Sequence, residues 1–149
     1  DRCDVNEIIN TCLVILNNRI RNRAEVIKNF TTEAVRVKGD EGKLHQAFMN
    51  ILSNAEQAIE HDGIIRISTE VDDDKVRISI KDNGVGIAPE NLEKISDPFF
   101  TTKPAGIGVG LGLFITYSIV DEHHGTIKVS SKPNVETEFI VSLPLHTEA

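Results

Sequence analysis

Hydrophobic residues recur with a helical period in three segments of the chain, which predicts three main helices. The segments cover 4–20, 40–60 and 111–122. Asp4 followed by Glu7 has the form of a capping box at the start of the first, and we expect Asp62-Gly63 to end the second. The apolar faces of the first two are formed by Val5, Ile8, Ile9, Cys12 and Leu16, then by Leu44, Ala47, Phe48, Ile51, Leu52, Ala55, Ala58 and Ile59.

Elsewhere apolar and polar side chains alternate, which is the pattern of half-buried strands. The expected strands cover 24–29, 34–38, 65–71, 76–81, 125–131 and 137–143. Helices and strands mingle without a regular βαβ repeat. We therefore predict an α+β fold, a two-layer α/β sandwich in which a mixed, largely antiparallel sheet of about five strands packs against three main helices.

The segment 83–110 differs from the rest because it is rich in glycine and proline, with one short helix expected near 89–95. A connection this long inside a compact domain suggests a functional loop. We see no internal repeat, linker or second domain, and 149 residues suit a single domain over 1–149.

The composition narrows the class of partner. A net charge of −7 argues against non-specific binding to nucleic acid or to an anionic membrane, while a small phosphate ligand stays compatible if backbone amides and a metal offset the charge. Two cysteines form no disulfide framework, no apolar run reaches the ~20 residues of a membrane span, and no signal peptide is visible. We expect a cytoplasmic domain whose parent protein could still carry a membrane anchor.

Asp82 is the first candidate for chemistry, because it continues the inward-facing positions of its strand. A carboxylate on the apolar face of a sheet is costly unless it has a hydrogen-bond partner. Asn83-Gly84 is a strong hairpin signal, but the residues after Gly86 do not continue as a strand. We favour an acceptor aimed at an exocyclic amine, with the glycines letting a flat ring approach the backbone. Thr137 places a second polar group at a strand end, a feature that alone is often structural.

The second helix carries a polar stripe beside its apolar face. The stripe consists of Gln46, Asn50, Asn54, Gln57 and His61. Asn50 and Asn54 are one turn apart, so their side chains are neighbours. Two interpretations stay open: the amides are merely solvated, or their carbonyl oxygens, with waters, hold a hard cation such as Mg²⁺.

A glycine-rich run from Gly106 to Gly112 opens the third helix. Such a run presents backbone amides to an anion, although it could also be a hinge. It follows no strand directly and contains no Gly-Lys-Ser/Thr, so it fits neither a Rossmann nor a P-loop pattern. Lys103 is the only basic residue between 95 and 127 and the expected cation for phosphates, and the adjacent Phe99 and Phe100 could anchor the loop or belong to the core.

Together these elements resemble the ATP-binding domain of two-component sensor histidine kinases, of the GHKL superfamily. All four boxes of that family occur in its usual order over nearly the whole chain. They are NILSNA at 50–55 (asparagine box), DNGVG at 82–86 (first glycine box), DPFFTTK at 97–103 (phenylalanine box) and GIGVGLGL at 106–113 (second glycine box). The short spacing of the last two is similar to the nitrogen-regulation type.

The resemblance implies a Bergerat fold that binds ATP and Mg²⁺. Asp82 would accept from the adenine amine, Asn54 would coordinate Mg²⁺, and the segment from about 86 to 106 would form a lid over the nucleotide. The nucleotide-binding residues that it implies are Asn50, Asn54, Gln57, Asp82, Gly84, Gly86, Ile87, Phe100, Thr101, Thr102, Lys103, Gly106, Gly108, Val109, Gly110, Leu111 and Thr137. Two positions depart from the family: Val109 replaces a small hydroxyl residue, and Glu136 stands where glycine is common.

The family's phosphoacceptor is a histidine followed by an acidic residue on a helical hairpin, and none of the five histidines here fits that role. His61 precedes Asp62 but follows the asparagine box. We expect the hairpin, which also dimerises these kinases, upstream of Asp1 in a longer protein. The resemblance then implies a domain that is monomeric alone, a homodimeric full-length kinase and a response regulator receiver domain as partner. The alternatives are a non-kinase GHKL ATPase and a nucleotide-binding pseudokinase that acts as an interaction module.

Overall fold

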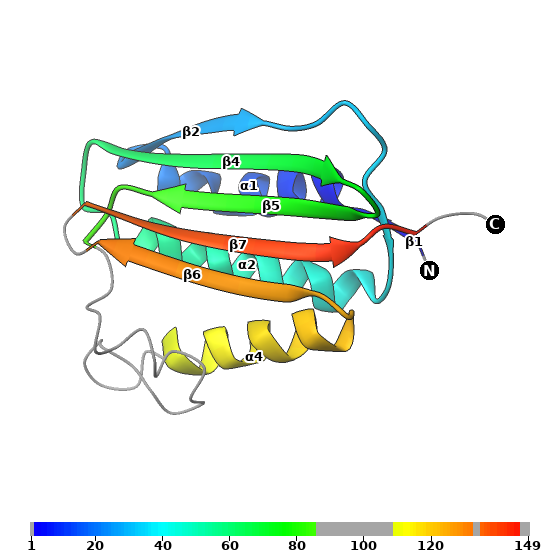
Figure 1. Ribbon diagram of the computed structural model, residues 1–149. Helices are drawn as coiled ribbons and strands as arrows, with labels where there is room; N and C mark the ends of the chain where they lie inside the picture. Colours follow the sequence, from blue (N-terminus) through cyan, green and yellow to red (C-terminus); the bar gives the residue numbers. More distant parts are fainter. Residues whose placement is uncertain (1, 86–108, 133–134, 147–149) are drawn as a thin grey trace.

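In the part of the chain that the structure describes, a five-stranded mixed sheet is covered on one face by the three helices α1, α2 and α4 (Figure 1). The computed structural model describes residues 2–85, 109–132 and 135–146, with the backbone alone described at 109–112. The elements are β1 (Arg2–Asp4), α1 (Val5–Ile20), β2 (Ala24–Asn29), β3 (Arg36–Lys38), α2 (Glu41–Gln57), β4 (Gly63–Asp72), β5 (Lys75–Asp82), α4 (Val109–Glu122), β6 (Thr126–Lys132) and β7 (Glu136–Pro144). The predicted α+β sandwich is confirmed, whereas the short helix expected near 89–95 lies outside the described residues.

The sheet order is β2-β4-β5-β7-β6. β2 runs parallel to β4 and the other three pairs are antiparallel, so the sheet is mixed and largely antiparallel as expected. In Figure 1, β5 ends and β7 begins at the left edge of the sheet, where α2 also ends. This edge brings the end of β5, with Asp82, next to the start of β7, with Thr137.

The core fills the space between the sheet and the helices. Burial alternates along β5 and β7, as a period of two requires, and the buried side chains include Ile78, Ile80, Phe139 and Val141. Cys12 on α1 is buried and carries a free thiol, as expected for a small core residue. None of the helices in the described ranges is long and apolar enough to cross a membrane.

Helix α2 begins as predicted but ends earlier. Asp40 caps its start, with Oδ1 accepting from the Lys43 N–H at 3.0 Å. The helix ends at Gln57, because the Ala58 N–H is shared between the carbonyls of Asn54 and Ala55 and the chain then turns. The expectation that Asp62-Gly63 ends this helix is wrong: Gly63 begins β4.

Arg23 supports this turn from the side. It donates from Nη1 to the Ile59 carbonyl at 3.2 Å and forms an ion pair with the buried carboxylate of Glu56. Arg23 therefore binds both the Ile59 carbonyl, which lies beyond the helix end, and the charged carboxylate of Glu56 in the core.

The two-stranded sheet of β1 and β3 was not expected in this form. β1 pairs antiparallel with β3, with Cys3 opposite Val37. The strand predicted over 34–38 is shorter, Arg36–Lys38, and β1 was missed because three residues are too few to show an alternation.

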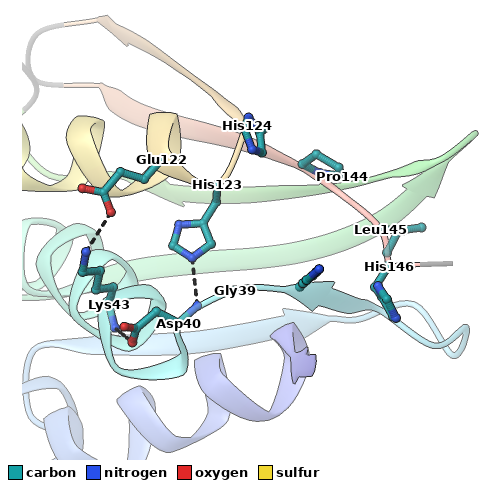
Figure 2. Close-up of a pocket in the computed structure, with 10 residues that line it drawn as sticks. Gly39, Asp40, Lys43, Glu122, His123, His124, Pro144, Leu145 and His146 are labelled. Atoms are coloured by element: carbon teal, nitrogen blue, oxygen red, sulfur yellow. Dashed lines mark hydrogen bonds and ion pairs between the residues drawn. The ribbon is translucent and has the colours of Figure 1, made fainter. Parts of the chain in front are cut away.

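The imidazole of His123 fastens the end of α4 to the start of α2. Its Nδ1 donates to the Ile119 carbonyl at 2.7 Å and its Nε2 accepts from the Asp40 N–H at 3.1 Å, which requires the neutral ring with the proton on Nδ1. Lys43 and Glu122 form a second link between the two helices at 2.9 Å (Figure 2). Asp40, Lys43, Glu122 and His123 line a pocket of about 610 Å³ (Figure 2). The pocket also includes Pro144, at the end of the sheet opposite Asp82.

We expect Gly39→Ala to break this link. A Cβ at Gly39 would lie 2.2 Å from Cδ2 and 2.4 Å from Nε2 of His123, so the ring must leave its place. Urea unfolding should show a loss of about 1–3 kcal/mol, the usual cost of overpacking. In a His123→Ala background the same change should cost clearly less. An equal cost in both backgrounds would show that the ring is not the obstacle.

Candidate functional site

A row of polar side chains crosses three strands at the edge of the sheet where β5 ends. Asp82 on β5 lies opposite Thr137 on β7, and Thr137 lies opposite Ser131 on β6. Asp82 and Thr137 are each 2% exposed and belong to the inward-facing set of their strands. The expected position of both polar groups, at strand ends on the helix-covered face, is confirmed.

Burial dominates the electrostatics of Asp82. It raises the pKa of the carboxyl to about 6, although the Gly84 N–H, which donates to Oδ1 at 2.9 Å, acts in the opposite direction. The group is therefore mostly ionised at neutral pH, in an environment that favours a strong hydrogen-bond donor as its partner. Such a partner could be an amine on a ligand.

The loop after Asp82 is held against the end of α2. The Val85 N–H donates to the Ala58 carbonyl at 3.1 Å, and a Cβ on Gly84 would lie 2.4 Å from the same oxygen. Asn83 faces the other way, where its Oδ1 accepts from the Ile64 N–H at the start of β4 at 2.8 Å. Gly84 is thus required by close approach to α2, which brings the first glycine box beside the last turn of the helix that carries Asn54.

The amides of α2 lie on the same side of the fold. Asn50 and Asn54 are both partly exposed and one turn apart. The Asn50 Nδ2 donates to the Thr116 hydroxyl on α4 at 3.3 Å. Gln57 is exposed, and its Nε2 donates to the Ser53 Oγ one turn back at 3.1 Å, so this amide is directed along the helix.

Three of the remaining predicted residues lie where the structure describes the backbone. Val109, Gly110 and Leu111 lie in the first turn of α4, where the backbone is described. The other predicted site residues fall outside the described part of the chain, as do the lid and its Phe99 anchor. They are Gly86, Ile87, Phe100, Thr101, Thr102, Lys103, Gly106 and Gly108.

Two polar residues at this site were not predicted. Ser131 Oγ lies 2.8 Å from Thr137 Oγ1, and Thr116 receives the hydrogen bond from Asn50. Ser131 was detectable, because it continues the inward alternation of Ile127 and Val129 on its strand. Thr116 lies within an apolar helix, and no local pattern predicts its contact.

Glu136 adds a charge on the face of the sheet opposite to that of Asp82 and Thr137, as the alternation along β7 requires. Its Oε2 lies 3.0 Å from the Lys81 Nζ, and both residues line a pocket of about 230 Å³ whose lining also includes Asp82. The acidic residue that stands at the position where glycine is usual is thus neutralised by its neighbour on β5.

This edge of the molecule can accept hydrogen bonds from a flat amine and can offer amide oxygens to a hard cation. Within the described residues, no group of three or more His, Cys, Asp or Glu side chains could hold a metal ion. The amide oxygens of α2, together with waters and ligand oxygens, match the coordination that Mg²⁺ accepts.

Comparisons with known proteins agree with this geometry. The model of the family "Histidine kinase-, DNA gyrase B-, and HSP90-like ATPase" matches residues 39–147. Sporulation kinase C of Bacillus subtilis is 37% identical over 147 residues, which are 97% of this chain and 34% of that protein. The signal transduction histidine-protein kinase AtoS of Escherichia coli is 38% identical over 146 residues, 97% of this chain and 24% of that protein. The chain thus spans about a third or less of these curated relatives.

Solved structures give the same result. The catalytic domain of histidine kinase ThkA is similar with a TM-score of 0.86 and 34% identity, covering 97% of this chain and 95% of that one. The structure of ThkA in complex with the response regulator protein TrrA is similar with a TM-score of 0.82 and 32% identity, covering 98% of this chain and 42% of that one.

Proposed function

Because this chain belongs to the family of histidine kinase-, DNA gyrase B- and HSP90-like ATPases, we propose that it binds MgATP and presents the γ-phosphate to a histidine on a separate phosphoacceptor domain. The observation that carries the proposal is the buried, mostly ionised Asp82 at the strand end, beside Thr137 and next to the end of α2. Its relatives among sensor histidine kinases favour a kinase over the gyrase-like or chaperone-like members of the family.

Each described residue has a proposed task. Asp82 accepts from the adenine amine, Thr137 lies beside the ring, and Gly84 keeps the backbone close to it. Asn54 supplies an oxygen to Mg²⁺, with Asn50 beside it. Bound Mg²⁺ would neutralise charge on the phosphates, and the protein's contribution is positioning the γ-phosphate for in-line attack.

The first turn of α4 and residues outside the described part complete the proposed site. Lys103 and the amides of the second glycine box, from Gly108 to Leu111, would bind the phosphates. The side chains of Phe99 and Phe100 would anchor the lid. The whole chain, 1–149, would act as one catalytic domain.

The partners follow from the chemistry that the chain lacks. A histidine-bearing helical hairpin must supply the attacking nitrogen and would dimerise the full-length protein, and a response regulator receiver domain would take the phosphoryl group onward. We propose a cytoplasmic location for this domain, because ATP is its substrate and Cys3 and Cys12 are free thiols.

Label transfer tests this proposal. We expect no label on this domain incubated alone with γ-labelled ATP and Mg²⁺, and label on a histidine-bearing hairpin domain when one from the parent protein or from a close relative is added. The control is the same hairpin with its histidine replaced by alanine. Steady ATP hydrolysis with no transfer would favour a non-kinase ATPase, and label on the domain alone would contradict a separate acceptor.

A further inference from the structure

Thr116 places a hydroxyl in the apolar contact between α4 and α2. It is 0% exposed, and the neighbouring positions of α4 that face the core are Leu113, Ile119 and Val120. Valine has almost the same shape, and a buried hydroxyl is costly unless it is hydrogen-bonded. The hydroxyl here accepts from Asn50 Nδ2 at 3.3 Å. Its partner is thus a predicted nucleotide-site residue.

This hydrogen bond is made by the nitrogen of the Asn50 amide, which gives the orientation of that side chain in this structure. An asparagine amide carries two donors on nitrogen and one acceptor oxygen, and a half-turn of the side chain exchanges them. Since Thr116 takes the nitrogen, the oxygen is directed elsewhere. A cation or its waters need the oxygen, whereas a phosphate needs the nitrogen. The orientation therefore decides which ligand Asn50 suits.

We propose that Thr116 is a positioning residue that holds the Asn50 amide with its oxygen toward the metal and its waters. The inference rests on the proposed binding of MgATP. It also links two parts of the site, because Thr116 lies on the helix whose first turn contains Val109 and Gly110, while Asn50 lies on the helix that carries Asn54. A change in either helix would turn or release the amide.

The test compares nucleotide binding with and without Mg²⁺. In Thr116→Val the ATP affinity measured calorimetrically in Mg²⁺ should fall about tenfold, the lower end of what losing a partner behind a metal ligand costs. Binding without Mg²⁺ should change less than about twofold, because adenine contacts at Asp82 are untouched. Thr116→Ser keeps the hydroxyl and should restore the Mg²⁺-dependent affinity.

A matched control is available at Thr69 on β4. Its buried hydroxyl donates to Asn6 Oδ1 at 2.9 Å, and both residues lie on elements other than α2 and α4. Thr69→Val should lower the stability and leave the ratio of affinities with and without Mg²⁺ unchanged. This separates loss of any buried hydrogen bond from loss of this one.

The nucleotide-free domain provides a second readout. In an NMR spectrum of the labelled protein, the side-chain NH₂ signals of Asn50 should shift in Thr116→Val and stay in place in Thr69→Val. In an Asn50→Ala background, Thr116→Val should no longer change the Mg²⁺ dependence.

Two results would overturn the inference. Equal weakening of ATP binding with and without Mg²⁺ would reduce Thr116 to a packing residue, and unchanged binding with unshifted Asn50 signals would remove the hydrogen bond altogether. If the unsubstituted domain binds no nucleotide under any condition, that result would instead overturn the proposed function, before any variant is compared.

Discussion

Replacing Asp82 with asparagine is expected to abolish most ATP binding while leaving the nucleotide-free fold at least as stable. The carboxylate accepts from the adenine amine, and a hydrogen bond to a charged group contributes about 1.5–3 kcal/mol. Asparagine can present its NH₂ to that amine, which places donor against donor. We expect the affinity to fall on the order of 100-fold or more, since a buried unpaired donor adds its own cost.

The same substitution should remove the loss of folding stability that the buried, ionised Asp82 carboxylate causes at neutral pH. The pKa of Asp82 is raised from 3.8 in the unfolded chain to about 6 in the folded state. The folded state therefore holds the proton more tightly between these values, and the free energy of unfolding falls as pH rises from about 4 to about 6. A shift of about two units corresponds to roughly 3 kcal/mol, all of it lost above pH 6.

Asparagine does not titrate, so its free energy of unfolding should lack this fall with pH. Part of this gain in stability is offset, because burying the new NH₂ group costs free energy. The side-chain oxygen of asparagine can still accept the hydrogen bond from the Gly84 N–H. We expect a net gain of about 1 kcal/mol at pH 7. A residue that lowers the stability of the folded protein is typical of a functional site, where activity requires a side chain that stability alone would not favour.

Calorimetry and urea unfolding at pH 4.5 and 7 measure both effects on one protein. Asp72→Asn is the control, because Asp72 is exposed at the opposite end of β4. It should leave both the ATP affinity and the stability at pH 7 unchanged. Parent-like ATP binding by Asp82→Asn would remove Asp82 from the adenine site, and a loss of both stability and binding would mean that the carboxylate is needed for the fold.

The position of Asp82 illustrates how much of the site strand periodicity predicts. Val76, Ile78 and Ile80 face the core, so the next residue in the period of two must face it as well, whatever its chemistry. The same argument places Thr137 on β7. The strands and the layer order followed from this local rule, because one buried face strongly specifies the register.

Helix ends and contacts between helices do not follow from such a rule. Ala58 and Ile59 continue the apolar period of α2 although the helix has ended, because Ile59 remains buried after the chain turns. Thr116 and Asn50 are far apart in sequence, and only the packing of α4 on α2 brings them together. Local periodicity also gives no position for Lys103, whose role stays a prediction.

Gly84→Ala is expected to cost both stability and nucleotide affinity. A Cβ at this position would lie 2.4 Å from the Ala58 oxygen and 2.7 Å from its carbonyl carbon. Both are backbone atoms of the helix end, so the loop must move away as a unit. The Val85 hydrogen bond to Ala58 would then lengthen, and the loss should be about 1–3 kcal/mol in urea unfolding.

Affinity should fall with stability in Gly84→Ala because Gly84 donates to the Asp82 carboxylate and lies against the turn that follows Asn54. Gly42→Ala is the matched control at the other end of α2, where a new Cβ would meet only Asp40 Oδ1 at 3.4 Å. Alanine there should leave ATP affinity unchanged and stabilise the helix by up to about 1 kcal/mol. Parent-like stability and affinity in Gly84→Ala would mean that the loop yields freely, and that contact with α2 does not position Asp82.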